Sequence, residues 1–525
     1  MVTRRTFIGG IGAFGGWRLF AAAPGACLGD EPNLRFGVLS DLHIRCVVGD
    51  RGYDGDAEGF RHALEYFRDR KVDAVMIAGD MSDLGIGDEL MSVARTWYGV
   101  FPNDRAPDGR TVEKIFITGN HESGTFVNPR NLAAIRRIFA GDDREVRRQI
   151  LRSDFATWWE RAFNEPYSRF YHKRVKGYDF LSAHWDDGTA LTPETPLEGL
   201  TWSFLGEDFG VPLKAWLEKH GKDLDPKKPF FYQQHRALWK SNFADWAWNH
   251  DRGVSTEVLS RYPNAVSFAG DTHYTLTDER SVWQGAFTSL GTASLRYTGM
   301  PYDSRDLASF ENSSARGRHA GTYNPLKTMS EYDPFMNRQG MVVSVYDDRM
   351  VVERRDFAND VPLGDDWVMP LDGSKPYGFE TRAKRAKAPE FPADARLLVR
   401  CVKAKTRGGK GVPKTEKDAV EIVIPPVAGM SGSRCFEFVV TAFGKDGKTA
   451  EFHVLAEGFD RHPGHARTKR PTHFTVALDR LPAGTDRFVV APLDCWWNRG
   501  AELSCAGWRP HESQGRASSP SVTAN

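Results

Sequence analysis

Residues 34–43, LRFGVLSDLH, begin as a run of strand-forming residues and end in a carboxylate and an imidazole. Apolar residues at helical spacing follow over residues 57–70, and a second strand-like run, AVMIA, occupies residues 74–78. A third run, KIFI, lies at residues 114–117. This alternation of strand, helix and strand predicts βαβ units in a layered α/β fold. In such folds functional residues gather where strands end and loops begin.

The length of 525 residues exceeds what one hydrophobic core ordinarily supports, so two domains are expected. The first, residues 33–368, closes with strand-like runs over residues 340–367. Residues 369–396, rich in Lys, Arg, Ala and Pro, indicate a linker. Residues 397–510 predict an all-β sandwich and residues 511–525 a disordered tail. The strand-like runs of the sandwich are residues 397–402, 420–424, 436–440, 452–455, 474–478 and 488–491.

The charge balance is close to neutral. A total of 70 Lys and Arg against 69 Asp and Glu gives a formal net charge of +1. This leaves no electrostatic reason to expect nucleic acid or an anionic membrane as the main partner. Any preference for a charged ligand must therefore be local. The sequence leaves the oligomeric state open.

The first 28 residues indicate an export signal. Arg4 and Arg5 precede an apolar, Gly-rich run that ends near Ala23, a pattern that resembles a bacterial twin-arginine signal. A transmembrane anchor is disfavoured because the run is short and Arg18 interrupts it. Cys27 leaves a weaker lipoprotein alternative. The protein is therefore expected in the periplasm or outside the cell, with no stable membrane insertion after signal cleavage.

Four cysteines lie in the C-terminal region. In an exported protein they permit disulfides in three possible pairings, and four free thiols are the other reading. The sequence leaves these alternatives open. The four residues are Cys401, Cys435, Cys495 and Cys505.

Polar clusters follow the first two strand-like runs. Asp41 and His43 stand two residues apart, so in an extended segment both side chains face one way and offer one oxygen and one nitrogen ligand to a divalent ion. Alone, such a pair is more often turn chemistry. In residues 79–83, GDMSD, Asp80 is placed at the rim of the sheet, where its carboxylate could bridge two cations. The alternative is an Asp that caps the next helix.

Further clusters follow later strand-like runs. In residues 119–122, GNHE, Asn120 offers an amide oxygen to a metal, while the adjacent His121 cannot point the same way and is left for charge stabilisation or proton donation. His235 follows an apolar run, and residues 270–273, GDTH, follow another. Each cluster is ordinary by itself, but their order along the chain is not.

The ordered set resembles the calcineurin-like metallophosphoesterase superfamily, with GNHE as its most specific element, and the resemblance covers residues 34–367. It implies two facing mixed sheets flanked by helices, with metals at the strand ends. It assigns one metal to Asp41, His43 and His273, the second to Asn120 and His235, and the bridge between them to Asp80. It also places His121 on the scissile phosphate, where it would stabilise the phosphate or protonate the leaving oxygen, beside Asn120.

One position departs from the family pattern. The family usually has a His where this chain has Asp271, at a ligand position of the second metal. An Asp ligand would favour a harder ion such as Mn²⁺ or Mg²⁺ over Zn²⁺, or it would leave the second site weaker. The expected cofactors are two divalent ions, with Mn, Fe and Zn left open. Arg236 could bind substrate phosphate as a fork donor, with a solvated Arg as the alternative.

The chemistry follows from charge. Two cations would neutralise the phosphoryl oxygens and lower the pKa of a bound water, and the resulting hydroxide would attack phosphorus in line. The predicted function is hydrolysis of a phosphomonoester or phosphodiester, so the expected partner is a small phosphorylated substrate. The competing hypothesis is a non-catalytic binding protein whose second metal site is degenerate. In the C-terminal region, residues 481–485 and 488–492 resemble the last strand pair of fibronectin type III domains, which implies an accessory sandwich.

Overall fold

The computed structural model describes residues 31–45, 53–124, 155–185, 208–243, 251–299, 310–312, 324–332, 337–407, 413–427 and 434–509. The predicted export signal and the predicted C-terminal tail lie outside these ranges. Within them, no helix combines the length and the apolar character that crossing a lipid bilayer requires.

The first sheet has seven strands in the order β12-β11-β10-β1-β2-β3, with β13 paired to β11. β1, β2 and β3 run parallel, so their carboxyl ends meet at one edge of the sheet. All three predicted N-terminal strands are confirmed. The strands are β1 (Leu34–Leu39), β2 (Ala74–Ala78), β3 (Glu113–Ile117), β10 (Gln339–Val345), β11 (Arg349–Asp356), β12 (Val361–Pro362) and β13 (Trp367–Pro370).

The second sheet has six strands in the order β4-β5-β6-β7-β9-β8. Its central strands β5, β6, β7 and β9 are parallel, which brings the loops after β6 and β7 to one edge as well. The strands are β4 (Phe170–Val175), β5 (Tyr178–Ala183), β6 (Phe230–Gln233), β7 (Ala265–Ala269), β8 (Val282–Gln284) and β9 (Thr288–Gly291).

The two sheets face each other across an apolar core. Phe36 of β1 lies in edge-to-face contact with Phe180 of β5 and Phe231 of β6, with ring centroids 5.3 and 4.8 Å apart. Each such pair stabilises the fold by about 0.5–1.5 kcal/mol beyond the contribution from burying the rings. This interior holds the two ligand-bearing edges against each other. The fold class predicted from the family resemblance is confirmed for this part of the chain.

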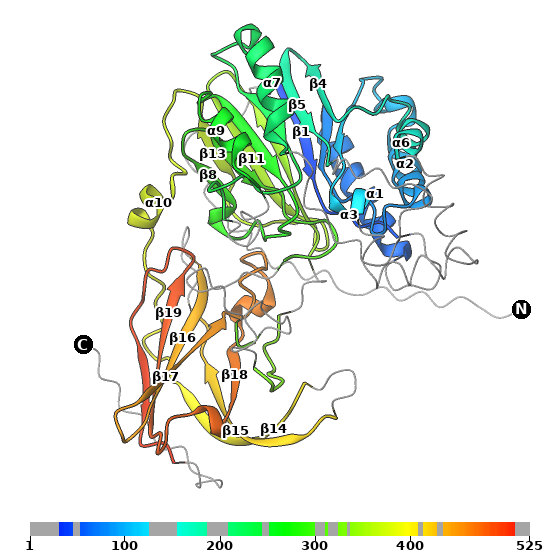
Figure 1. Cartoon of the computed structure of the whole chain (residues 1–525). Coiled ribbons are helices and arrows are strands. Elements are labelled where there is room, and N and C mark those ends of the chain that lie inside the picture. Colours follow the sequence, from blue (N-terminus) through cyan, green and yellow to red (C-terminus); the bar gives the residue numbers. More distant parts are fainter. Residues whose placement is uncertain are drawn as a thin grey trace, which may run out of the picture.

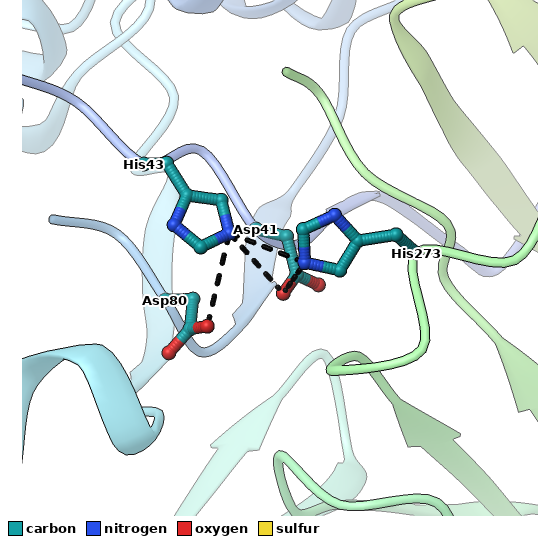
Figure 2. Close-up of side chains that lie close together, drawn as sticks. All are labelled: Asp41, His43, Asp80 and His273. Atoms are coloured by element: carbon teal, nitrogen blue, oxygen red, sulfur yellow. Dashed lines mark hydrogen bonds and ion pairs between the residues drawn. The ribbon is translucent and has the colours of Figure 1, made fainter. Parts of the chain in front are cut away.

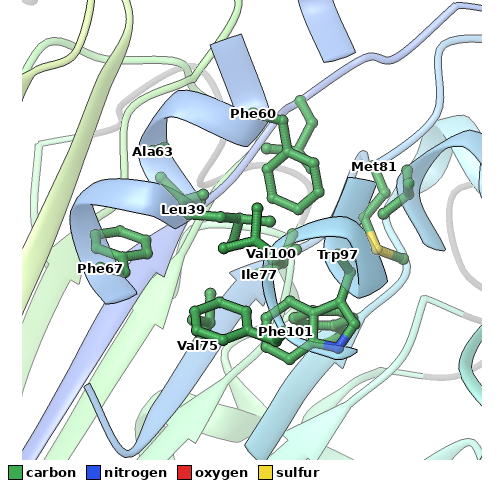
Figure 3. Packing of buried hydrophobic residues seen from close by; sticks show 14 of the residues in the cluster. Leu39, Phe60, Ala63, Phe67, Val75, Ile77, Met81, Trp97, Val100 and Phe101 are labelled. Carbon is green, nitrogen blue, oxygen red and sulfur yellow. The ribbon is translucent and has the colours of Figure 1, made fainter. Parts of the chain in front are cut away.

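Helices cover the outer faces of both sheets (Figure 1). Figure 3 shows Phe60 of α1 and Trp97 of α2 packed over Ile77 of β2. Burial of each such side chain contributes roughly 1.5–3 kcal/mol to the stability of the folded state. α7 and α9 cover the second sheet in the same way. The helices are α1 (Tyr53–Asp69), α2 (Gly87–Val100), α3 (Asn120–Gly124), α6 (Phe155–Phe163), α7 (Gly210–His220), α9 (Val254–Leu259) and α10 (Phe379–Arg385), with 3₁₀ turns η1 (Pro102–Asp104), η3 (Gly221–Asp223), η4 (Glu279–Ser281), η6 (Ala466–Lys469) and η7 (Leu478–Arg480).

The C-terminal strands form a sheet of three strands, β14-β15-β18, and a sheet of four, β17-β16-β19-β20. Both sheets contribute side chains to one apolar core, which confirms the predicted all-β region, and all four cysteines are free thiols. The strands are β14 (Leu398–Lys405), β15 (Glu416–Ile424), β16 (Cys435–Phe443), β17 (Thr449–Leu455), β18 (Thr472–Ala477), β19 (Arg487–Asp494) and β20 (Leu503–Ala506).

The segment predicted as a linker, residues 369–396, carries a helix that the sequence did not predict. α10 has no apolar stripe, and its contacts come from both halves of the chain. Arg382 pairs with Glu279 of the first part, and the ring of Phe379 lies 5.5 Å from that of Trp496 in the sandwich. Tertiary contacts therefore hold a helix that local periodicity does not favour.

Candidate metal centre

The loops that leave the parallel strands have an unusual backbone. Asp41 and His43 after β1, Asp80 after β2, and Asp271 and His273 after β7 all have positive φ, between 44° and 65°. This region is uncommon for residues other than Gly, and each such residue costs about 1–3 kcal/mol. Such strain persists only where the surroundings hold it, and it concentrates at functional sites.

The first half-site consists of Asp41, His43 and His273 together with one oxygen of Asp80 (Figure 2). Nε2 of His273 lies 2.9 Å from Oδ1 of Asp41 and 3.2 Å from Nε2 of His43. Nε2 of His43 lies 3.8 Å from Oδ2 of Asp80. The ligand atoms of all four residues lie within 4.8 Å of one another, and all four side chains are buried.

The second half-site consists of Asn120, His235 and Asp271 with the other oxygen of Asp80. Nε2 of His235 lies 3.1 Å from Oδ1 of Asn120, 3.3 Å from Oδ1 of Asp80 and 3.8 Å from Oδ1 of Asp271. Asp80 thus turns Oδ1 to this half-site and Oδ2 to the first. The structure brings together all seven residues that the sequence predicted as ligands.

Backbone carbonyls orient three of the imidazoles. Nδ1 of His273 donates to the carbonyl of Tyr297 at 3.0 Å. Nδ1 of His235 donates to the carbonyl of Ala78 at 2.7 Å, and Nδ1 of His121 donates to the carbonyl of Asp83 at 2.7 Å. Since a carbonyl only accepts, Nδ1 carries the proton, and in the neutral ring Nε2 is left with a lone pair. This second bond of the ring is the usual arrangement of metal-binding histidines.

The converging atoms are oxygens and imidazole nitrogens, all of which can ligate a cation. Oδ2 of Asp41 accepts from Oγ of Ser40 at 2.5 Å and from the amide of Asp271 at 3.2 Å, and its Oδ1 is buried. Oδ1 lies 2.9 Å from Nε2 of His273, and although burial disfavours the charged ring, the nearby Asp41 raises the pKa of this imidazole. Oxygen and imidazole donors in this number suit a divalent transition metal, so the residues present fit the expected ions.

The charges lead to the same conclusion. Burial alone would lower the pKa of His235, but Asp80, with Asp41 and Asp271, raises it to about 10. Burial opposes ionisation of Asp80, yet His235, His121 and His43 hold the pKa of this carboxyl well below its usual range. The carboxylates therefore require positive charge among them, which either protons on the histidines or bound cations would supply.

The family model described as calcineurin-like phosphoesterase matches residues 34–275, a range that contains all seven candidate ligands. These residues form a calcineurin-like phosphoesterase domain. The resemblance predicted from the sequence is confirmed for this range, and so is the enzyme class, a hydrolase of the phosphoesterase type. Comparison of the sequence with curated proteins gives no match.

Several solved structures match this chain at low identity. A dimetal phosphatase from Danio rerio is 15% identical with a TM-score of 0.36, and the match covers 65% of this chain and 100% of that one. A purple acid phosphatase from yellow lupin (Lupinus luteus) seeds is 13% identical with a TM-score of 0.37, covering 65% and 55%. The chain thus spans about half of the lupin protein. Vps29 from Entamoeba histolytica, complexed with Zn²⁺, is 8% identical with a TM-score of 0.25, covering 65% and 100%.

Arg236 of the phosphoesterase domain lies beside the second half-site. Its Nη1 pairs with Oδ2 of Asp271, and its guanidinium carbon lies 4.6 Å from the ring centroid of Trp185. Only 2% of Arg236 is exposed, so the alternative of a solvated Arg is wrong. Oδ2 of Asp271 therefore pairs with Arg236, while Oδ1 faces His235 of the second half-site.

Glu122 connects the loop that carries Asp80 to the loop that carries Asn120 by hydrogen bonds. The sequence did not predict this role. Its carboxylate accepts from the amide and hydroxyl of Ser82 at 2.7 and 2.8 Å, and from the amide of Gly119 at 2.6 Å. Burial and the charge of Asp80 raise the pKa of Glu122 to about 7. The signal was present in the sequence, because Glu122 is the last residue of the GNHE element.

Asp83 contacts the Nδ1 side of His43, and Arg296 in turn binds Asp83. The sequence predicted a role for neither residue. Oδ1 of Asp83 lies 3.4 Å from Nδ1 of His43 and accepts from Nη1 of Arg296 at 2.8 Å. Asp83 is the second acid of the GDMSD element, so its spacing was visible in the sequence. Arg296 follows no motif that would have marked it.

Tyr297 and His121 lie at the rim of the first half-site. The ring of Tyr297 lies 4.2 Å from that of His273 and 5.4 Å from that of His43, and no sequence signal indicated it. Nε2 of His121 lies 3.9 Å from Oδ2 of Asp80, and 21% of its side chain is exposed. His121 is thus more accessible than the buried ligands that surround it.

Proposed function

We propose that this chain is an exported phosphoric ester hydrolase that uses two divalent metal ions and acts on a phosphomonoester or a phosphodiester of a small substrate. The observation that carries the proposal is the position of Asp80, which turns one carboxylate oxygen to each of two ligand groups. A carboxylate placed in this way suits a bridge between two cations.

Two bound ions would supply positive charge to the phosphoryl oxygens and lower the pKa of water at the site. The residues proposed to hold them are Asp41, His43, Asp80, Asn120, His235, Asp271 and His273. Their Nδ1 bonds to backbone carbonyls fix two of the imidazoles, His235 and His273, with Nε2 toward the centre. The site therefore requires little reorganisation to bind cations.

His121 is proposed as the residue that acts on the leaving group. Its backbone amide donates to Oδ1 of Asp80 at 2.9 Å, and its Nδ1 is occupied by the carbonyl of Asp83 at 2.7 Å. A proton for the leaving oxygen must therefore reside on Nε2, the partly exposed nitrogen. The protonated ring would also stabilise negative charge on the phosphate, together with the amide of Asn120.

Arg236 and Asp271 are proposed to set the preference for metal and substrate. The carboxylate of Asp271 would supply an oxygen ligand at the second half-site, and an oxygen ligand favours Mn²⁺ or Mg²⁺ over Zn²⁺. Arg236 is proposed as a donor to substrate phosphate, because a guanidinium stacked on Trp185 has few alternative conformations.

Export by the twin-arginine route rests on Arg4 and Arg5 and on the apolar run that follows them. Replacing both by Lys is expected to retain the protein in the cytoplasm. A fibronectin type III-like character of the C-terminal sandwich is supported by its two sheets of three and four strands. Its implied role is that of an accessory domain.

The deciding experiment measures metal content and hydrolysis on the full chain. After reconstitution with Mn²⁺, Fe²⁺ or Zn²⁺, we expect about two ions per chain and hydrolysis of an aryl phosphate or a bis-aryl phosphate. The ratio of the two rates separates monoesterase from diesterase activity. Metal binding without hydrolysis of either ester would favour the non-catalytic alternative, and absence of metal binding would overturn the proposal.

A further inference from the structure

A turn of the sandwich packs against Thr277 and Gln339, which belong to the first part of the chain. This support turn, residues 456–461, follows β17. The carbonyl of Phe459 accepts from Oγ1 of Thr277 at 2.9 Å, and the carbonyl of Asp460 accepts from Nε2 of Gln339 at 3.5 Å. Asp460 and its neighbour Arg461 are each only 2% exposed. In Figure 1 the sandwich lies directly below the two sheets.

A chain of buried hydrogen bonds leads from the support turn to Thr298. Nδ2 of Asn337 lies 2.5 Å from Oδ2 of Asp460 and 3.3 Å from Oγ1 of Thr298, and Oδ1 of Asn337 accepts from Nη1 of Arg461 at 2.9 Å. A second path uses Tyr332, whose ring packs on Phe459 and whose hydroxyl lies 2.5 Å from Oγ1 of Thr298. Thr298 is thus held from the sandwich side by two neighbours.

Both residues that flank Thr298 bind His273. The carbonyl of Tyr297 accepts from Nδ1 of His273 at 3.0 Å, and the amide of Gly299 donates to the carbonyl of His273 at 2.6 Å. A Cβ at position 299 would collide with the carbonyl of Thr272, so the two backbones are in close contact. The position of Thr298 therefore determines how the imidazole of His273 is held.

We infer that the sandwich is a structural part of the metal centre and that Asp460 is a positioning residue for His273, acting through Asn337 and Thr298. The inference rests on the proposed metal-binding function. An interface that only joined two domains would not need buried polar groups aimed at residues 297–299. Partners of ligating histidines typically change metal affinity by ~10–100-fold when they are removed.

The test uses calorimetric titration of the full, metal-free chain with Mn²⁺, well below the melting temperature of each variant. Asp460→Ala is expected to weaken one Mn²⁺ step by ~10-fold or more, whereas Asp460→Asn, which keeps an acceptor for Asn337, stays within ~3-fold of wild type. Asn498→Ala is the matched control, because it removes a hydrogen bond from the sandwich to Ala383 of α10, away from residues 297–299. The control is expected to bind as wild type does.

A double-mutant cycle separates positioning from general destabilisation. In a His273→Ala background, Asp460→Ala is expected to have no further effect on Mn²⁺ affinity. An unchanged affinity in Asp460→Ala, or an equal loss with and without His273, would overturn the inference. If Asp460→Ala does not fold, Thr298→Val breaks the same chain without changing side-chain shape and carries the same expectation. If wild type binds no Mn²⁺, the same titrations are run with Fe²⁺ or Zn²⁺ under the same expectations, and a wild-type chain that binds none of the three ions contradicts the proposed function itself.

Discussion

The two half-sites share Asp80 but differ in the charge around them. The first combines Asp41 with two imidazoles, whereas the second combines Asp271 with a guanidinium that already neutralises it, that of Arg236. A cation entering the second half-site therefore meets less negative charge than one entering the first. We expect the first half-site to fill first and to bind its ion more tightly.

Asp80→Ala removes the residue that both half-sites share and is expected to have the largest effect. Turnover should fall by ~10³-fold or more, and both ions should bind more weakly, because each loses an oxygen ligand. Steady-state kinetics and metal analysis check the prediction. Asp88→Ala, at an exposed position of α2, is the control. Two tightly bound ions in Asp80→Ala would show that the half-sites are independent.

His121→Ala tests a residue that belongs to neither half-site. We expect turnover to fall by ~10²–10⁴-fold while the metal content stays at the wild-type level, since His121 acts on the leaving group. An ester with a more acidic leaving group should recover part of the rate. Loss of a metal ion from this variant would instead make His121 a ligand.

Asp271→His restores the residue that the family usually carries and should make the two half-sites more alike. It releases Arg236 from its ion pair and replaces an oxygen ligand by nitrogen, so the preference of the second ion for Zn²⁺ over Mn²⁺ should rise by ~10-fold. Competitive metal titration measures this ratio. Asp271→Asn keeps the oxygen and serves as the control. An unchanged ratio would mean that residue 271 does not contact the ion.

Glu122→Gln probes the link between the loops of Asp80 and Asn120 and is expected to have the smallest effect. With a pKa of about 7 in the folded protein, Glu122 retains a proton that the unfolded chain loses above its ordinary pKa. The contribution of Glu122 to stability is therefore fully present below that ordinary value and is lost as the pH rises through about 7.

The measurement is urea unfolding of the metal-free protein at about pH 5 and about pH 8. Relative to Glu122→Gln, wild type should lose stability between these two conditions. If the difference between the two proteins does not depend on pH, Glu122 is ionised throughout this range.

The sequence predicted what is local in this molecule. Apolar runs such as residues 74–78 marked the strands because a buried parallel strand is apolar on both faces. Asp80 and Asn120 were found because each lies shortly after the end of such a run. The helix α10 was missed because residues 379–385 have no apolar stripe of their own. The sandwich strands were found from their spacing by turn residues.

Contacts between distant residues could not be predicted. Whether Arg236 is solvated depends on Asp271, 35 positions later, and on the ring of Trp185. Tyr297 and Asp460 follow no strand-end motif, and their importance arises only when loops far apart in sequence meet. The order of motifs was sufficient to assemble the candidate ligands, but not to identify the groups that hold them.

The left-handed backbone at five candidate ligands has a consequence for engineering. Asp, Asn and His tolerate this conformation better than other side chains, and Gly tolerates it best. Random libraries at these positions should therefore tolerate few alternatives, with β-branched residues excluded first. A selection for heat resistance would favour glycine at these positions, because glycine relieves the backbone strain. Each such substitution would remove a candidate metal ligand, so stability and metal binding favour different residues here.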